Sequence, residues 1–246
     1  MSIYIGNTKY KEIYLGSNKI SEVYLGSNKI FAGSSPGPGP DPYNPLGLPA
    51  NTVRVRTNNG KTPVKGSKAT YETATLVTGT SDVYDVYKSG TSFDHFLYQS
   101  TNIVEVLGAN TTGITDMNYM FYGCNRLTTV PLFDTSSVTI MEYMFYSCGR
   151  LTAVPLFNTS SVTTMRYTFN GCASLTSVPL LNTSSVTNMS YSFRDCPMVE
   201  SGALALYQQA STQTNPPTSY TRCFRDCGSS TTTGAAELAQ IPSGWK

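Results

Sequence analysis

The sequence predicts a repeat solenoid, capped at both ends and preceded by a small N-terminal β-meander. The main observation is a Phe-x-x-Cys signature that recurs every 24 residues, and the surrounding text repeats with it, as in VTIMEYMFYSCGRLTAVPLFNTSS and VTTMRYTFNGCASLTSVPLLNTSS. A fixed period of this length is typical of a solenoid, in which each unit stacks on its neighbours. The regular signatures are Phe121 with Cys124, Phe145 with Cys148, Phe169 with Cys172, and Phe193 with Cys196.

Each unit is expected to contain a short strand and a helical turn. Leu151, Val154 and Leu156 predict the strand, which should end before Asn158. Apolar residues at three- and four-residue steps over 162–169 predict the helical turn. These two pieces define the predicted coil of the solenoid.

Two columns of short side chains are expected to support the stack. Cys occupies one position of each unit and is interpreted as a small buried hydrophobe, with disulfides as the alternative. Asn or Asp occupies another position, where it favours side-chain-to-backbone hydrogen bonds at a turn; glycosylation is the alternative for the Asn-Thr-Ser text. The expected structural ladder consists of Cys124, Cys148, Cys172 and Cys196, and of Asn110, Asp134, Asn158 and Asn182.

A shorter repeat lies at residues 1–32. The text Tyr-Leu-Gly-Ser-Asn-Lys-Ile occurs twice at a ten-residue interval, after a degenerate first copy. Apolar residues separated by Gly-Ser-Asn predict strands joined by tight turns, with Tyr4, Tyr14 and Tyr24 in register. So short a segment buries too little surface to fold alone. We therefore expect an anchor that docks on sister chains, as a homo-oligomer, on a larger assembly, or on the rest of this chain.

Amino-acid composition predicts the remaining segment boundaries of the chain. Alternating Pro and Gly predict a linker, and a solenoid needs both of its open ends covered. The expected organisation is a β-meander anchor at 1–32, a linker at 33–49, an N-terminal cap at 50–100, repeats at 101–200 and a C-terminal cap at 201–246.

Tyrosine recurs two residues before each buried Phe. Stacking would place these side chains in a continuous stripe. We interpret the stripe either as cover for the layer beneath it or as a sugar- or protein-binding surface. The candidate binding residues are Tyr119, Tyr143, Tyr167 and Tyr191, with Tyr122 and Tyr146 beside them.

Several function classes are disfavoured by composition. Charged residues make up 13% of the chain and the net charge is +2, against about a quarter charged in typical proteins, so nucleic acid and anionic membranes are not expected partners. No apolar run reaches the roughly 18 residues that span a bilayer, and no secretory signal is visible. With the single His95 and no Cys-x-x-Cys pair, we expect no metal, no cofactor and no enzyme activity.

Residues 144–151 read MFYSCGRL, which fits the pattern Ala-Phe-x-x-Cys-x-x-Leu with Met in place of Ala. The unit thereby resembles the BspA-like leucine-rich repeats. Residues 117–124, MNYMFYGC, are similar to a Met-x-x-Met-Phe-x-x-Cys branch found in mycoplasma, gut-bacterial surface and gut phage proteins. Thr168 and Ser192 depart from that branch at its second Met. The N-terminal module is similar to phage structural proteins.

The resemblance implies surface display and adhesion. We expect a structural or adhesion protein of a phage virion, fibre-like or decorating the particle. Residues 1–32 would attach to other virion proteins at the particle surface or to sister chains, and the repeats would bind a glycan or protein of the host surface. A bacterial cell-surface adhesin and an intracellular protein-interaction scaffold are the alternatives.

Overall fold

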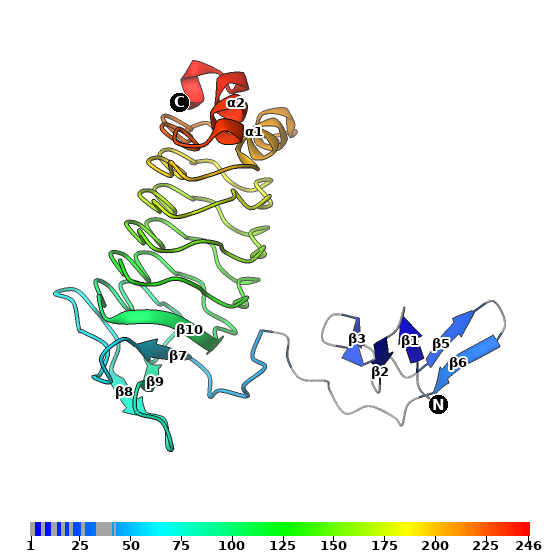
Figure 1. The fold of residues 1–246 in the computed structure, drawn as a ribbon, viewed down its shortest axis with the longest axis vertical. Coiled ribbons are helices and arrows are strands. Elements are labelled where there is room, and N and C mark those ends of the chain that lie inside the picture. Colours follow the sequence, from blue (N-terminus) through cyan, green and yellow to red (C-terminus); the bar gives the residue numbers. More distant parts are fainter. Residues whose placement is uncertain are drawn as a thin grey trace. The chain divides into compact units, whose positions relative to one another are not determined.

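The computed structural model describes residues 3–5, 8–10, 14–15, 18–19, 22–25, 28–32, 41 and 43–246. The chain divides into two compact units, Met1–Gly47 and Leu48–Lys246. Each unit is described by itself (Figure 1).

The first unit contains three short antiparallel strand pairs. Tyr4, Tyr14 and Tyr24 each lie in the first strand of a pair, in register with Lys9, Lys19 and Lys29 respectively. The predicted β-meander is wrong, because each described pair is a separate two-stranded sheet: each strand pairs only with its neighbour in the sequence. The linker predicted at 33–49 falls largely at 33–40 and 42, which lie outside the described residues. The pairs are β1 (Ile3–Ile5) with β2 (Thr8–Tyr10), β3 (Tyr14–Leu15) with β4 (Asn18–Lys19), and β5 (Glu22–Leu25) with β6 (Asn28–Ala32).

The second unit begins with a four-stranded antiparallel sheet in the order β10-β7-β9-β8. Side chains of the inner strand β7 point alternately to the two faces of the sheet, and those of Val53 and Val55 are fully buried. Arg54, on the other face, binds the Asp85 carboxylate through two nitrogens at 2.7 and 2.8 Å. The strands are β7 (Thr52–Thr57), β8 (Thr73–Leu76), β9 (Val83–Tyr87) and β10 (Ile103–Asn110).

Residues 111–200 follow as a stack of turns (Figure 1). Backbone N–H groups at alternate positions donate to carbonyls of the next unit, as from Tyr119 to Glu142 at 2.9 Å and from Phe121 to Met144 at 2.8 Å. The intervening N–H groups close turns within the unit. Single parallel bridges, such as that between residues 116 and 140, add to this register. Backbone hydrogen bonds thus join each unit to the next.

The predicted fold class, a solenoid with a strand and a helical turn in each coil, is wrong. Within residues 111–200 the structure has neither element; the strands precede this segment and the two α-helices follow it. The helical turn predicted over 162–169 fails because Tyr167 has φ of 57°, which a right-handed helix excludes. The strand fails because Pro155 has no N–H to donate, and Leu156, one of the apolar residues that predicted the strand, is 63% exposed.

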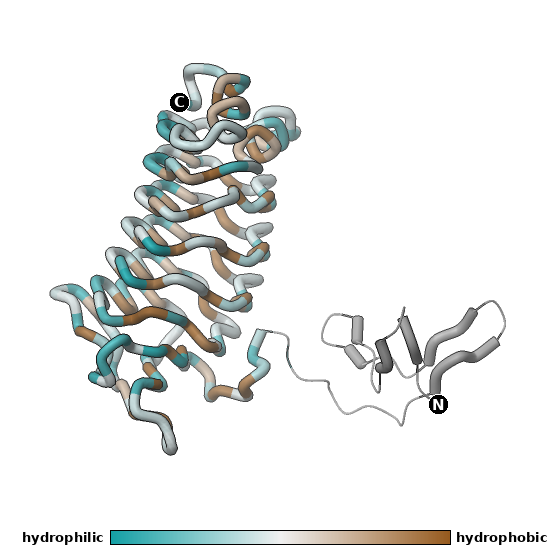
Figure 2. Tube along the Cα trace, viewed as in Figure 1, coloured by the Kyte–Doolittle hydropathy of each residue, from teal (hydrophilic) through white to brown (hydrophobic). Residues whose placement is uncertain are grey.

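Aromatic and sulfur-containing side chains fill the interior of the stack. Phe121, Phe145, Phe169 and Phe193 are buried and stack in one column, with ring centroids 5.4, 5.5 and 5.0 Å apart. Figure 2 shows hydrophobic segments recurring on successive turns. The interior therefore repeats with the same interval as the sequence.

Two helices and a 3₁₀ turn cover the last unit (Figure 1). The Gln209 amide donates to the Leu181 carbonyl at 2.6 Å, which ties α1 to the stack. The Glu237 carboxylate of α2 accepts the Leu204 N–H at 3.1 Å, so it stabilises the N-terminus of α1. These elements are α1 (Ala203–Thr212), α2 (Thr232–Gln240) and η1 (Ser243–Trp245).

Candidate binding surface

One tyrosine from each repeat enters a continuous column of stacked rings. Tyr119, Tyr143, Tyr167 and Tyr191 lie with ring centroids 4.6, 4.6 and 4.5 Å apart and interplanar angles of 6°, 14° and 2°. His95 extends the column at its N-terminal end, 4.4 Å from Tyr119. The structure therefore brings together the four tyrosines singled out in the sequence and adds one imidazole.

A second, shorter column runs beside the first. Tyr98, Tyr122 and Tyr146 stack at 4.7 Å in both steps. Tilted contacts join the columns, as between Tyr143 and Tyr146 at 5.6 Å. We call the eight rings of the two columns the aromatic face; its members are His95, Tyr119, Tyr143, Tyr167, Tyr191, Tyr98, Tyr122 and Tyr146.

His95 and Tyr98 were missed as site residues at the sequence level, although a signal for them exists. Each lies one period of 24 residues before a recognised tyrosine, Tyr119 and Tyr122 respectively. The flanking text does not repeat there, which hides the relationship. The repeat register thus begins before the first regular signature.

The backbone explains why the rings stack. All four tyrosines of the first column are in the left-handed region, with φ between 53° and 63°, and His95 has φ 55°. This conformation is uncommon for bulky residues. Here each of these N–H groups bonds the following unit, as Tyr143 does to the Arg166 carbonyl at 3.0 Å. Identical backbone geometry in each unit directs identical side chains the same way.

Stacking determines which part of each ring is available to a binding partner. Neighbours within a column cover the ring faces, so the partly exposed surface consists of ring edges and hydroxyls. Burial raises the pKa of the Tyr122 and Tyr143 phenols above their ordinary value. Burial also raises the pKa of Tyr119, and the Glu142 carboxylate adds to that shift while Arg166 opposes it. These hydroxyls therefore stay protonated and able to donate at neutral pH.

Charged side chains border the first column unevenly. The Arg166 guanidinium lies over the Tyr167 ring, 4.9 Å from its centroid, and that of Arg194 lies 5.8 Å from Tyr191. Glu142 accepts a hydrogen bond from the Thr164 hydroxyl at 2.7 Å. The rings repeat regularly while their borders differ from unit to unit, which is how a regular scaffold can present a specific surface.

The cysteines lie inside the stack, away from this face. All six are buried and free. Each thiol of the regular column donates to a backbone carbonyl 27 residues earlier, at 3.1 to 3.2 Å, as Cys172 does to Phe145. The carbonyl acceptors for Cys124, Cys148 and Cys196 are those of Leu97, Phe121 and Phe169.

The Asn and Asp column lies at a turn. Each side-chain oxygen accepts the N–H two residues later, with distances from 2.9 Å at Asn182 to 3.4 Å at Asn110. Asp134 and Asn158 also accept the hydroxyl of Ser136 and of Ser160. The next residue, as at Thr135, donates its hydroxyl to the following unit's carbonyl. This column therefore closes turns and joins units.

The described part of the chain contains no group of three or more His, Cys, Asp or Glu placed to hold a metal ion. Among the same residues, no helix is both long and apolar enough to cross a bilayer.

Comparison with known proteins gives one match. A family model described as "Mycoplasma protein of unknown function, DUF285" matches residues 90–207. All eight residues of the aromatic face lie within that segment. No curated protein and no solved structure matches the chain.

Proposed function

We propose that this protein is a non-catalytic attachment protein of a phage particle. Residues 1–32 hold it on the particle, and the repeats present the aromatic face to a glycan or protein of the host surface. The phage assignment rests on the resemblance of the repeat and of the N-terminal module to phage proteins.

The fixed spacing of the rings in the aromatic face supports the binding role. Rings held 4.5 to 4.7 Å apart by their neighbours have little side-chain freedom left to lose when a partner binds. Tyrosine also combines a large contact area with a hydroxyl that donates and accepts hydrogen bonds. A row of such edges, bordered by Glu142 and Arg166, has the composition of a recognition surface.

The reactive residue types support binding over catalysis. Burial raises the pKa of the Cys124 and Cys196 thiols to about 12, so almost no thiolate forms at neutral pH. The His95 ring is engaged on two sides: its Nδ1 lies 2.7 Å from the Asp94 carboxylate, and its face stacks on Tyr119.

Repetition in residues 3–32 supports an anchoring role. Each strand pair sets a tyrosine opposite a lysine, at Tyr4 with Lys9 and again ten and twenty residues later. A module built from three small units gains stability when another surface covers it. A symmetric oligomer of this chain, or a socket on a particle protein, would supply that cover.

Deletion of residues 1–32 tests the proposal. The deleted chain should stay folded and monomeric by light scattering, and it should no longer sediment with purified particles that bind the full chain. Mass spectrometry of purified particles should find the protein as a component. Its absence from particles, or unchanged sedimentation of the deleted chain, would contradict the proposal.

A bacterial cell-surface adhesin is the second candidate. The matched family is described as a Mycoplasma protein, which favours a bacterial origin. Fractionation separates the two candidates, because an adhesin should be found in the cell envelope of uninfected bacteria.

A further inference from the structure

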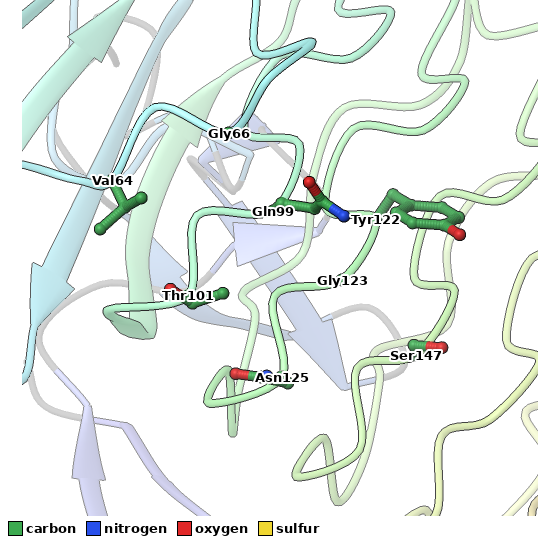
Figure 3. A pocket seen from close by; sticks show the side chains of 8 residues that line it. All are labelled: Val64, Gly66, Gln99, Thr101, Tyr122, Gly123, Asn125 and Ser147. Carbon is green, nitrogen blue, oxygen red and sulfur yellow. The ribbon is translucent and has the colours of Figure 1, made fainter.

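A shallow depression lies at the N-terminal end of the aromatic face, beside Tyr122. It has a volume of about 530 Å³, within the range of roughly 300 to 1,000 Å³ found for small-molecule sites. Figure 3 shows that the lining comes from four segments that are distant in sequence. The eight lining residues are Val64 and Gly66, Gln99 and Thr101, Tyr122, Gly123 and Asn125, and Ser147.

The floor of the depression follows from the repeat. Gln99, Gly123 and Ser147 occupy the same repeat position in successive units, and all three have positive φ, at 53°, 69° and 56°. Between the two side chains, Gly123 contributes none; an added Cβ would lie 3.1 Å from the Gln99 Cγ. Gly123 therefore lines the depression with backbone alone.

The wall of the depression is held firmly by the N-terminal segment. Gly66 packs directly on the backbone of Tyr98, where an added Cβ would lie 2.1 Å from the carbonyl oxygen. The Val64 carbonyl accepts a hydrogen bond from the Ser100 hydroxyl at 2.7 Å, and the Val64 N–H donates one to the Asn102 side-chain oxygen at 2.7 Å. The site is therefore formed before a ligand binds.

The lining chemistry selects a class of ligand. None of the eight lining residues is charged, so a charged ligand would find no counter-charge there. The side chains of Gln99, Thr101, Asn125 and Ser147 make no hydrogen bond to any residue that the structure describes. An apolar ligand would leave these groups unpaired, which is unfavourable. A neutral ligand rich in hydroxyls both donates to and accepts from amides and hydroxyls.

The geometry points to a binding subsite for a neutral saccharide, one or two sugar rings in size, in the depression formed by Gln99, Thr101, Asn125 and Ser147 beside Tyr122. This inference rests on the proposed attachment function and gives its ligand class. The saccharide binds through hydrogen bonds and the edge of Tyr122, since the faces of that ring are covered by Tyr98 and Tyr146.

Two substitutions remove polar groups from the depression with little risk to folding. Asn125→Ala and Ser147→Gly each introduce the residue found at the same position of another repeat, Ala173 and Gly171. Neither side chain is in the core. The matched control is Ser184→Ala with Thr214→Ala, two exposed hydroxyls outside the depression.

The full chain should be screened against an array of neutral, sialylated and sulfated glycans, and its affinity for a selected neutral glycan measured by calorimetry. We expect neutral glycans to be selected, the N125A/S147G variant to weaken binding by about tenfold or more, and the control to bind as the parent does. Selection of charged glycans only, no glycan binding, or unchanged affinity of N125A/S147G would overturn the subsite.

Host-cell binding separates this inference from the attachment function. If N125A/S147G binds cells as well as the parent while replacement of Tyr143 and Tyr167 abolishes binding, the subsite is wrong and the attachment function stands. If the parent chain itself does not bind cells, the attachment function is wrong as well.

Discussion

The thiol of Cys148 donates a hydrogen bond to the backbone carbonyl of Phe121 at 3.2 Å, although the two residues are 27 positions apart. The contact joins one unit to the preceding one inside the buried core. It repeats at the three other regular cysteines. The cysteine column is therefore a set of side-chain links between units as well as apolar filling.

Replacing Cys148 tests this link. Cys148→Ala should lower the free energy of unfolding by about 1–3 kcal/mol, because it removes buried volume and the hydrogen bond together. Cys148→Ser should cost less, since a buried hydroxyl can make the same bond, as the Ser192 hydroxyl does to the Met165 carbonyl at 2.7 Å. Urea unfolding followed by circular dichroism measures both. Equal stability of the Ala variant and the parent would show that the link contributes nothing.

The buried thiols should make the fold sensitive to alkali. Burial raises the pKa of Cys124 from its ordinary value near 9 to about 12, so the thiol contributes stability below about pH 9 that is lost toward pH 12. In that window the unfolded chain binds fewer protons than the native chain. Each such thiol therefore lowers the free energy of unfolding by about 1.4 kcal/mol per pH unit.

Urea titrations from about pH 8 to about pH 10, under reducing conditions, measure this slope. Because the unfolded thiol titrates within this range, the Cys124→Ala variant should lose about 1.4 kcal/mol less than the parent over the whole range, an average of about 0.7 kcal/mol per pH unit. A slope identical to that of the parent would contradict the assignment of a buried, protonated thiol.

Gly202 should be intolerant of any side chain. Its φ is 93°, and an added Cβ would lie 2.2 Å from the Val178 carbonyl oxygen. Gly202→Ala should lower the free energy of unfolding by about 3 kcal/mol or more, from backbone strain and the forced shift of α1. Gly149→Ala is the control, because an added Cβ there meets nothing within 4 Å. Similar melting temperatures for the two variants would refute this packing.

The repeat register could be predicted from the sequence, whereas the path of the backbone could not. Phe145 and Cys148 recur at one interval and lie in columns, because residues one period apart adopt the same conformation in successive units. The expected helical turn failed at Tyr167, and Ser147 of the preceding unit also has positive φ, although neither residue type signals that conformation. Only Gly123 and Gly171, at the same position as Ser147, carry that signal.

The candidate site, too, could be predicted from the sequence only in part. The tyrosine columns follow from the 24-residue interval, and so does the alignment of Gln99 with Ser147. The wall of the depression does not, because Val64 and Gly66 come from a non-repeating segment whose position depends on hydrogen bonds to Ser100 and Asn102. Long-range contacts of this kind leave no periodic trace in a sequence.

Binding of the fluorescently labelled full chain to intact host cells tests the aromatic face most directly. The test variant is Tyr143→Asn with Tyr167→Asn, since Asn tolerates positive φ and removes two stacked rings. The control is Leu156→Asn with Leu180→Asn, at two exposed leucines elsewhere in the repeat. Flow cytometry should show that the tyrosine variant loses at least about tenfold in affinity, through the loss of two ordered contact residues, while the control binds as the parent does. Unchanged binding by a folded tyrosine variant would contradict the assignment of this face as the binding surface.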